Sequence, residues 1–457
     1  MHQERTTRWC TIRCSVNCSA AGSGRRSRQR PRLSWLTRDD LAWGAFVTVA
    51  PYLTGRAWAD LDAQQLADLL AATRQKGWRQ ALSDIERDAP FFVKRMRNLA
   101  LGNWHLLLLR DRADSALDVG CGFGSLPLGL AEYYRNAVGA EFLPNRIAYA
   151  STRAAEDARH GCRFVRASGF SLPFEAGSFG LVTLNGVLEW AGVYADGNPR
   201  ALQLRMLGEA RRVLVPGKGH LAVAIENRFA LESVLGMPDT HTGVIWPTVL
   251  PRWAANAVTR LRTGAQFRTY LYHPPSYRRL LRDAGFPSAR VFDLISSYND
   301  YDFVVDVDDV ATYGFLFQQD RVRAFYRLAG RVRRALRQTW PNALRRVGYA
   351  NLVIGGATVS TILDATHPLW QAVASTGATP GRYRFGCQGE AAGQLTVVSH
   401  DGARVTGMVE LGTTLPTDDG LVSIPARVHG LFGSGLRPAA RLQVGGVECR
   451  VHLPTAA

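Results

Sequence analysis

The sequence predicts an α/β fold, with a mainly parallel seven-stranded sheet flanked by helices and a C-terminal β-rich appendage. Two observations carry this prediction. From Ser115 onward, short apolar runs of strand length alternate with segments of helical length, a pattern typical of a parallel sheet with helical crossovers. From about residue 356 the chain is instead rich in Gly and Pro, with short β-like runs. We therefore expect one α/β domain over 111–355 and a small β-rich region of unknown role over 356–457.

The positive charge of the chain is concentrated near its beginning. The net charge is +17, and residues 1–38 carry nine arginines against one acidic residue. We expect residues 1–36 to form a disordered basic head, or to precede the true start. The remaining charge leaves contact with a nucleic acid or with an anionic surface open. No stretch approaches the ~18 apolar residues that a membrane-spanning helix needs, and no signal peptide is evident.

The seven cysteines predict neither disulfides nor a metal centre. Their number is odd and no spacing marks a disulfide framework, which fits a reduced, cytoplasmic setting. Cys10, Cys14 and Cys18 recur every four residues and could hold a metal or a cluster. Because they lie in the basic head, we expect no metal site there, and we expect none in the rest of the chain.

Residues 37–110 are predicted to form an N-terminal helical cap. A first helix passes through Leu66 and Leu70, and a second covers Trp78–Ile85. The run Phe91–Leu109 is apolar on most helical faces and leads into the first strand of the sheet. Such helices can cover a ligand or pack in the core.

A glycine turn follows the first predicted strand, Ala116–Val119. Glycine stands at every second position, which lets the backbone approach a ligand closely because no Cβ intervenes. The helix that follows, Ser125–Tyr133, adds free N–H groups at its first turn. We therefore expect a nucleotide-like ligand at the carboxyl end of this strand. The glycines of the turn are Gly120, Gly122 and Gly124.

The spacing of this turn departs from a dinucleotide fingerprint, because Ser125 stands where the third glycine should be. Asp118, two residues before the first glycine, would repel a pyrophosphate but suits a cation. D-x-G-x-G-x-G resembles motif I of the class I S-adenosylmethionine (SAM) dependent methyltransferases, whose cofactor carries a sulfonium and no phosphate. The resemblance implies a Rossmann-like sheet and SAM as the cofactor. The implied turn residues are Asp118, Gly120, Cys121, Gly122 and Gly124.

The second predicted strand, Ala137–Glu141, ends in an acid. Glu141 lies 19 positions after Gly122, near the separation at which a carboxylate reaches ribose hydroxyls. It could instead cap the helix that begins near Pro144. Glu141 suits SAM and NAD equally, so it does not decide the cofactor.

The segment Ala167–Val182, A-S-G-F-S-L-P-F-E-A-G-S-F-G-L-V, extends the resemblance. Many small-molecule methyltransferases of the ubiquinone/menaquinone type carry G-D-A-x-x-L-P-F-x-x-x-S-F-D-x-V here. Ser168 replaces the Asp that accepts from the adenine amino group, and a hydroxyl can also accept. Gly180 replaces a second Asp. Both departures count against membership of the quinone subgroup.

The end of the fourth predicted strand, Leu181–Leu184, faces cofactor and acceptor in this family. The resemblance implies that Asn185 lines the sulfonium site and that Glu189 contacts the acceptor or the cofactor. The alternative is a helix-start turn with Trp190 in the core.

The remaining elements are predicted as a helix over Ala201–Val213, a strand over His220–Ile225, a helix over Pro275–Ala284, and strands over Ala289–Leu294 and Tyr349–Gly355, with insertions at 227–274 and 296–347.

The first insertion is predicted to hold the acceptor side. The pattern E-N-R…G-x-x-D-x-H-T-G, which begins at Glu226 and ends at Gly243, resembles methyltransferases found with bacterial surface-polysaccharide enzymes. We expect Asp239 and His241 to orient or deprotonate an acceptor hydroxyl. The alternative is that Asp239 caps a turn and His241 lies at the surface. The aromatic residues that follow could stack on a sugar or quinone ring, or pack in a lid.

The second insertion contains a basic amphipathic helix, predicted over Gln319–Gln338. Its apolar residues share one face and five arginines fall on another. Such a helix can lie on an anionic membrane or on RNA, or it can dock with a solvated basic face. The position of this helix in space distinguishes the two.

Together these patterns predict transfer of a methyl group from SAM to a small-molecule or glycan-related acceptor by in-line displacement. One alternative is an RNA-modifying methyltransferase that uses the basic surfaces, although the chain has N-G-V-L at 185–188 instead of the N-P-P-Y type tetrapeptide of many amino-methylating nucleic-acid enzymes. Another is a SAM-binding protein without turnover, because of Ser168 and Gly180.

Overall fold

The computed structural model describes most of residues 61–361 and the strands that follow. The described residues are 61, 63–108, 115–295, 297–299, 301, 303–308, 331–336, 343 and 345–361, together with the backbone of the strands between residues 381 and 454. The predicted basic head, residues 1–36, lies outside the described residues, as do its three cysteines.

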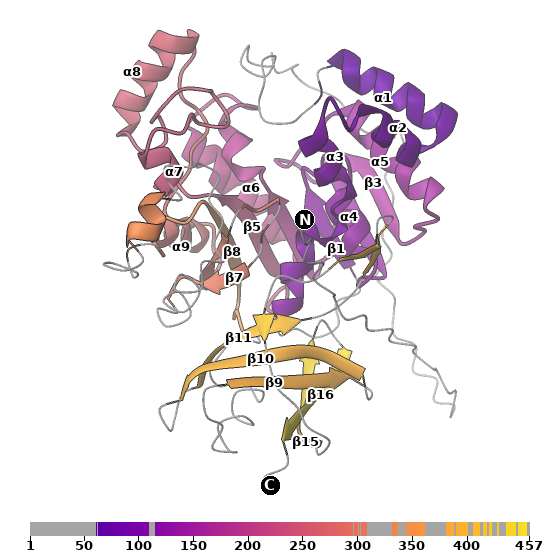
Figure 1. Ribbon diagram of the computed structural model, residues 1–457. Coiled ribbons are helices and arrows are strands. Elements are labelled where there is room, and N and C mark those ends of the chain that lie inside the picture. Colours follow the sequence, from indigo (N-terminus) through magenta and orange to yellow (C-terminus); the bar gives the residue numbers. More distant parts are fainter. Residues whose placement is uncertain are drawn as a thin grey trace, which may run out of the picture.

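An eight-stranded sheet organises the described α/β region (Figure 1). Its strand order is β3-β2-β1-β4-β5-β8-β6-β7. The first five strands in this order, from β3 to β5, pair in parallel. Strand β8 runs antiparallel to both β5 and β6. The strands are β1 (Ser115–Val119), β2 (Asn136–Glu141), β3 (Cys162–Arg166), β4 (Leu181–Asn185), β5 (His220–Glu226), β6 (Ser288–Ile295), β7 (Phe303–Asp306) and β8 (Ala350–Gly356).

The sheet has one strand more than the seven predicted. The additional strand β7 pairs antiparallel with β6 at the edge of the sheet, within the span predicted as the second insertion. The strand predicted over Tyr349–Gly355 is confirmed as β8, which inserts between β5 and β6. The predicted mainly parallel α/β fold is therefore confirmed, and its strand count is corrected.

The helices between the strands begin where the sequence supplies start signals. Pro stands at the beginning of α5, α6 and α9, where its missing N–H costs no helical hydrogen bond. The side chain of Asn198 caps α6 by accepting from the backbone N–H groups of Arg200 and Ala201. These helices are α4 (Ser125–Leu130), α5 (Pro144–Glu156), α6 (Pro199–Val213) and α9 (Pro274–Asp283).

The N-terminal helices pack beside α5 (Figure 1). Trp78 anchors them, because its backbone N–H and its indole Nε1–H donate to Glu156 and Asp157 at 2.9 and 2.8 Å. The apolar run Phe91–Leu109 is divided at Asn98, whose Nδ2 donates to Asn299 O at 3.0 Å. The elements are α1 (Ala63–Lys76), α2 (Trp78–Ile85), α3 (Pro90–Arg97) and the 3-10 helix η2 (Leu99–Leu107).

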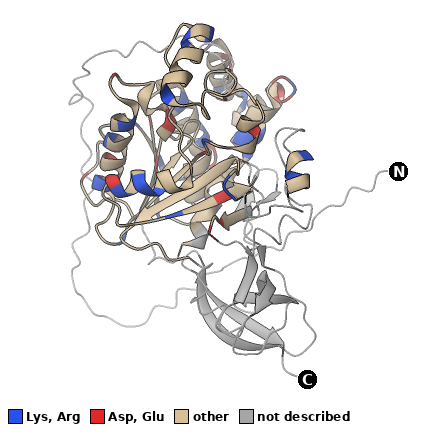
Figure 2. Cartoon of the chain, turned by 90° about the vertical axis from the view of Figure 1, so that its left-hand side faces the viewer, with Lys and Arg blue, Asp and Glu red and all other residues tan. Residues whose placement is uncertain are grey.

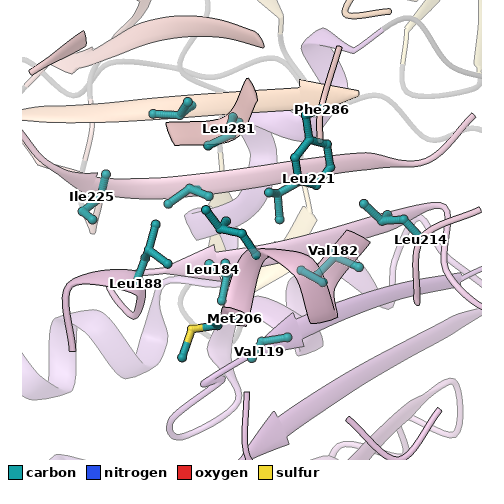
Figure 3. Packing of buried hydrophobic residues seen from close by; sticks show 14 of the residues in the cluster. Val119, Val182, Leu184, Leu188, Met206, Leu214, Leu221, Ile225, Leu281 and Phe286 are labelled. Carbon is teal, nitrogen blue, oxygen red and sulfur yellow. The ribbon is translucent and has the colours of Figure 1, made fainter. Parts of the chain in front are cut away.

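The main hydrophobic core lies between the central strands and the helices α6 and α9 (Figure 3). Leu184 and Leu221 come from neighbouring strands, Met206 from α6 and Leu281 from α9. All seven residues of β5 are buried, as expected of a strand covered on both faces. Burial of each large apolar side chain here stabilises the folded state by roughly 1.5–3 kcal/mol. This packing holds the carboxyl ends of β4 and β5 in place.

The C-terminal region is β-rich, as predicted. A six-stranded antiparallel sheet has the order β14-β11-β10-β9-β16-β15, and β12 pairs with β13. Val444 pairs with Val447, so β15 and β16 are consecutive antiparallel strands. The strands are β9 (Gly381–Cys387), β10 (Glu390–His400), β11 (Val405–Leu411), β12 (Leu415–Thr417), β13 (Gly420–Val422), β14 (Arg427–Val428), β15 (Leu436–Val444) and β16 (Val447–Pro454).

The residues that the structure describes include no helix long and apolar enough to cross a membrane.

Candidate functional site

The glycine turn after β1 has the backbone conformation that its glycines predict. Gly120, Gly122 and Gly124 have φ angles of 72°, 55° and 87°, a left-handed region that favours glycine. The N–H groups of Gly120 and Cys121 both donate to Ala140 O of β2, at 2.7 and 3.1 Å. The turn is therefore fixed to the carboxyl end of the second strand.

The three glycines serve different purposes. A Cβ on Gly120 would lie 2.6 Å from Val187 Cγ2, and one on Gly124 would lie 2.7 Å from the Phe164 ring. A Cβ on Gly122 would meet nothing within 4 Å. The outer glycines are thus needed for packing, whereas Gly122 faces open space in which a ligand can approach the backbone.

Glu141 is tied to the same turn. Its Oε2 accepts from the Gly122 N–H at 3.0 Å, and its Oε1 accepts from the N–H groups of Phe142 and Leu143 at 2.9 and 3.0 Å. A carboxylate offers about four lone-pair positions, so one stays available for a hydroxyl. Glu141 is positioned at the turn, and ribose binding by it stays a prediction.

Asp118 lies under the turn as a buried acid, 3% exposed. Thr183 Oγ1 donates to its Oδ1 at 2.5 Å. Burial, with the nearby charge of Glu141, raises the pKa of Asp118 to about 7. Burial also raises the pKa of the Cys121 thiol well above its usual range, so Cys121 lines the turn as a neutral group.

Ser168 follows β3 and Asn185 ends β4, two strands that β2 and β1 separate in the sheet. Ser168 is half-buried, and its Oγ accepts from the Phe170 N–H at 3.3 Å. Asn185 ends β4, and its buried Oδ1 has no hydrogen-bond partner among the described residues. An orphaned amide oxygen at a strand end fits a ligand that carries a hydrogen-bond donor, such as an amino group.

A second group of polar residues gathers at the carboxyl ends of β4 and β5. Glu189 lies on the 3-10 helix η3 (Leu188–Gly192) that follows β4, and Glu226 is the last residue of β5. Asp239 and His241 come from the loop of the first insertion. All four side chains are buried, and we call them the carboxylate–histidine cluster.

His241 is the centre of this cluster. Its Nδ1 lies 3.1 Å from Asp239 Oδ1, and its Nε2 lies 3.8 Å from Glu189 Oε1. Asp239 is fixed in turn, because its Oδ2 accepts from the N–H and the hydroxyl of Thr242 at 2.8 and 2.7 Å. His241 is 5% exposed and packs edge-on against Trp190. The alternative of a surface histidine is therefore wrong, although Asp239 does close a turn.

The protonation of the cluster follows from its burial and from its crowded carboxylates. Burial alone would lower the pKa of His241, but the charges of Asp239, Glu189 and Glu226 outweigh it and hold this pKa well above its usual value. Although burial acts to raise the pKa of Asp239, the charge of His241 and the Thr242 hydrogen bonds hold it low. Burial raises the pKa of Glu226 to about 7. His241 and Asp239 therefore form an ion pair.

Two acids of the cluster have oxygens without hydrogen-bond partners among the described residues. Neither Oε1 nor Oε2 of Glu189 makes a hydrogen bond, and Oε2 of Glu226 makes none. Oε1 of Glu226 accepts from the Tyr298 hydroxyl at 3.3 Å. These oxygens are available to an acceptor group or to a cation.

Glu226 was not among the predicted site residues. It begins the pattern predicted for the acceptor side, but no role was predicted for the residue itself. The usable signal is an acid at the carboxyl end of a central strand, the same signal that singled out Glu141.

The first insertion leaves and rejoins the sheet at one place. Asn227 bridges Tyr272 in parallel, and the Arg228 N–H donates to Tyr272 O at 2.9 Å. The Arg228 side chain holds the loop by donating to Thr248 O and Leu250 O at 2.9 and 2.8 Å. The insertion contains α7 (Leu231–Val234) and α8 (Arg252–Thr263).

The predicted aromatic residues of this insertion separate into two groups. Phe267 is buried in the core, and Arg252 stacks over Tyr270 with its Cζ 4.0 Å from the ring centroid. Trp246 and Trp253 are 50% and 77% exposed. Stacking on an acceptor ring stays a prediction for the exposed pair.

The described part of the predicted basic helix is docked. Residues 331–336 are helical, and Arg333 is buried, with its Nη2 2.9 and 3.1 Å from the two carboxylate oxygens of Glu232 on α7. Arg331 and Arg334 are exposed. The rest of the predicted helix lies outside the described residues.

Comparison with known proteins matches part of the chain. A family model described as "Methyltransferase domain" matches residues 117–223. A demethylmenaquinone methyltransferase of Lactococcus lactis subsp. lactis (strain IL1403) is 32% identical over 106 residues, which are 22% of this chain and 38% of that relative. The matched stretch thus spans less than two-fifths of the relative's length.

Two solved structures of methyltransferases are similar to part of this chain. A SAM-dependent methyltransferase of Thermotoga maritima is 15% identical, with 62% of this chain and 100% of that chain covered and a TM-score of 0.35. A Haemonchus contortus phosphoethanolamine N-methyltransferase in complex with S-adenosyl-L-methionine is 13% identical, with 64% and 60% covered and a TM-score of 0.36.

Proposed function

Because residues 117–223 form a class I SAM-dependent methyltransferase domain, whose cofactor is S-adenosylmethionine, we propose that the chain transfers a methyl group from SAM to a small-molecule or glycan-related acceptor. The observation that carries this proposal is the carboxylate–histidine cluster. It lies at the carboxyl ends of β4 and β5, on the same edge of the parallel sheet as the glycine turn after β1. Ligands of open α/β sheets bind along this edge.

On the cofactor side, the proposal assigns each group a role that its surroundings fit. The open space over Gly122 receives the cofactor next to the backbone. The remaining lone pair of Glu141 accepts from a ribose hydroxyl, and the hydroxyl of Ser168 accepts from the adenine edge. The orphaned Oδ1 of Asn185 accepts from the amino group of the methionine part. Gly120, Gly124, Asp118 and Cys121 shape and support the turn.

On the acceptor side, the cluster supplies acceptors of hydrogen bonds in a dry site. The partnerless oxygens of Glu189 contact the acceptor group. His241, protonated and held by Asp239, orients an acceptor hydroxyl, and a carboxylate of the cluster accepts the proton of that hydroxyl. In-line displacement moves the methyl group from sulfur to the acceptor atom, and the acceptor proton passes to the cluster. Alignment of the two reactants is the main demand of such a transfer.

Two experiments test the proposal in sequence. Calorimetry with SAM and with NAD should show binding of SAM alone, and binding of NAD alone would overturn the cofactor assignment. Turnover is then measured as release of S-adenosylhomocysteine with a panel of hydroxylated small molecules and nucleotide-linked sugars. His241→Ala should bind SAM as the wild type does and lose most of its turnover. Turnover at the wild-type rate would remove His241 from the mechanism.

The exposed His160 provides the matched control for this variant. His160→Ala removes an imidazole at the surface, after α5, and should keep both SAM binding and turnover. SAM binding without release of product from any acceptor would favour the alternative of a binding protein without turnover.

The RNA-modifying alternative is less well supported. Figure 2 shows basic residues spread over several helices, not gathered on one, and the described part of the arginine-rich helix has its Arg333 buried against Glu232. An RNA enzyme should bind nucleic acid with a steep salt dependence. Loss of that binding on deletion of residues 1–36 alone would point to a nonspecific tail.

A further inference from the structure

Three side chains of the cluster bring metal-type ligand atoms together. One carboxylate oxygen of Glu189, one of Glu226 and one ring nitrogen of His241 all lie within 4.8 Å of one another. A divalent cation binds such oxygen and nitrogen ligands at about 2.0–2.2 Å, which places opposite ligands about 4.4 Å apart. Three ligands of one ion cannot all be opposite, and adjacent ligands lie only about 3–3.6 Å apart. The three groups would therefore approach one another by about an ångström to bind one ion.

The bonding of these side chains is incomplete without a further group. Glu189 is 0% exposed, and neither of its carboxylate oxygens has a hydrogen-bond partner among the described residues. Glu226 is 7% exposed, and its Oε2 is also without a partner there. Glu189 Oε1 lies 3.8 Å from His241 Nε2, but a buried carboxylate normally also accepts hydrogen bonds or binds a metal, because its desolvation is costly.

Asp239 fixes the ring of His241 in the way that a carboxylate fixes a metal-binding histidine. It lies 3.1 Å from Nδ1, so the other nitrogen, Nε2, is directed toward Glu189. Histidine ligands almost always donate their second N–H to a carboxylate, a carbonyl or a water, which fixes the ring and its tautomer. Asp239 is itself fixed by two hydrogen bonds from Thr242.

We propose that Glu189, Glu226 and His241 bind one divalent first-row cation, with Asp239 as the positioning residue for His241. Two carboxylates and one imidazole suit ions such as Mn²⁺ or Fe²⁺. What the ion does rests on the proposed function. Beside the acceptor it polarises an acceptor hydroxyl, and His241 then orients the ion and is not the base. The sequence predicted no metal site, because the three ligands are 37 and 15 residues apart along the chain.

Binding of Mn²⁺ tests the proposal without reference to turnover. Full-length protein without a histidine tag is stripped with a chelator, and free Mn²⁺ is followed by electron paramagnetic resonance during titration. Mn²⁺ is chosen because it prefers oxygen ligands, which keeps the head cysteines from competing. We expect about one bound Mn²⁺ per chain in the wild type. His241→Ala and Glu189→Gln should weaken binding at least about tenfold, and Asp239→Asn by roughly 10–100-fold.

Controls separate the loss of ligands from the loss of fold. The exposed residues His160 and Glu175 give the matched variants His160→Ala and Glu175→Gln, which should bind Mn²⁺ as the wild type does. Glu189→Gln and Asp239→Asn keep the shape of their side chains, so they remain informative where an alanine variant unfolds. Thermal unfolding of every variant is measured in parallel.

The outcomes also separate this proposal from the proposed function. Absence of Mn²⁺ binding, or equal binding by the wild type and Glu189→Gln, overturns the cation site. The proposed function still stands in that case if SAM binds. Conversely, one Mn²⁺ bound through these residues by a chain that does not bind SAM supports the cation site and refutes the proposed function.

Discussion

Glu141 and Gly122, 19 positions apart in the chain, are joined by a hydrogen bond of 3.0 Å from the Gly122 N–H to Oε2. This bond ties the end of the second strand to the centre of the glycine turn. The same carboxylate also accepts from two further backbone N–H groups. A change at Glu141 should therefore affect both the shape of the turn and its ligand.

Replacement of this carboxylate by an amide should weaken SAM binding. In Glu141→Gln one oxygen becomes an NH₂ group. This group cannot accept a hydrogen bond from the backbone N–H groups that the oxygen accepted from. Loss of one or two such hydrogen bonds costs about 1–1.5 kcal/mol, or roughly tenfold in Kd. Calorimetric titration with SAM measures it, with the exposed Glu175→Gln as control. Equal affinities of wild type and variant would show that Glu141 neither orders the turn nor contacts the cofactor.

Gly122→Ala should block the cofactor with little other harm. Its Cβ would enter the open space at the turn, and its φ of +55° adds a strain of about 1–2 kcal/mol. Gly217 is the matched control, since it has a φ of +74° and a Cβ there would also meet nothing within 4 Å. Both variants should lose similar stability in urea unfolding, but only Gly122→Ala should lose SAM affinity, by at least about tenfold. Equal SAM binding by both would place the cofactor elsewhere.

The strands and the cofactor turn could be predicted because local patterns determine them. The predicted strand His220–Ile225 and the observed β5 differ by one residue, since a run of buried apolar residues marks a central strand. The glycine turn follows from conformational freedom alone. The resemblance to methyltransferases is confirmed over residues 117–223, which a family model described as "Methyltransferase domain" matches. The mainly parallel α/β fold is confirmed by the order of the sheet.

Features that depend on distant partners could not be predicted. The break at Asn98 coincides with a hydrogen bond from its side chain to Asn299 O, 201 positions away along the chain. Strand β7 has four residues and exists through its pairing with β6. Glu226 belongs to the cluster because β5 ends beside η3 and the Asp239 loop, a juxtaposition that only the folded chain creates. The contacts of buried polar groups are therefore the part of the structure that could least be predicted from the sequence.

The raised pKa of Asp118 predicts a pH dependence of stability. Asp118 has a pKa of about 7 in the folded chain, against 3.8 for an ordinary Asp. Between these values the folded chain binds more protons than the unfolded chain, so the free energy of unfolding falls as the pH rises, by at most about 1.4 kcal/mol per pH unit. Asp118→Asn should remove this slope. Urea unfolding from pH 4.5 to 7.5 measures the difference between the two proteins.

Thr183→Val supplies the complementary variant. Its hydroxyl donates to Asp118 at 2.5 Å and lowers the pKa of that acid. Without the hydroxyl the decline in stability should extend to higher pH than in the wild type. Parallel curves for the wild type and Asp118→Asn would contradict the burial argument, because Asp118 would then titrate alike in both states.

The buried pair of Arg333 and Glu232 should hold the second insertion against α7. Their side chains are 7% and 1% exposed, and removal of one partner of a buried pair typically costs about 3–5 kcal/mol, because the other charge is left uncompensated. Arg333→Met should therefore lower the free energy of unfolding by about this amount, measured by urea unfolding followed by tryptophan fluorescence. The double variant Glu232→Leu with Arg333→Met should recover most of the loss, since neither charge is then buried. The exposed neighbour Arg334 provides the control Arg334→Met, which should change stability by less than about 0.5 kcal/mol. Equal effects of Arg333→Met and Arg334→Met would mean that the described helix is not anchored by this pair.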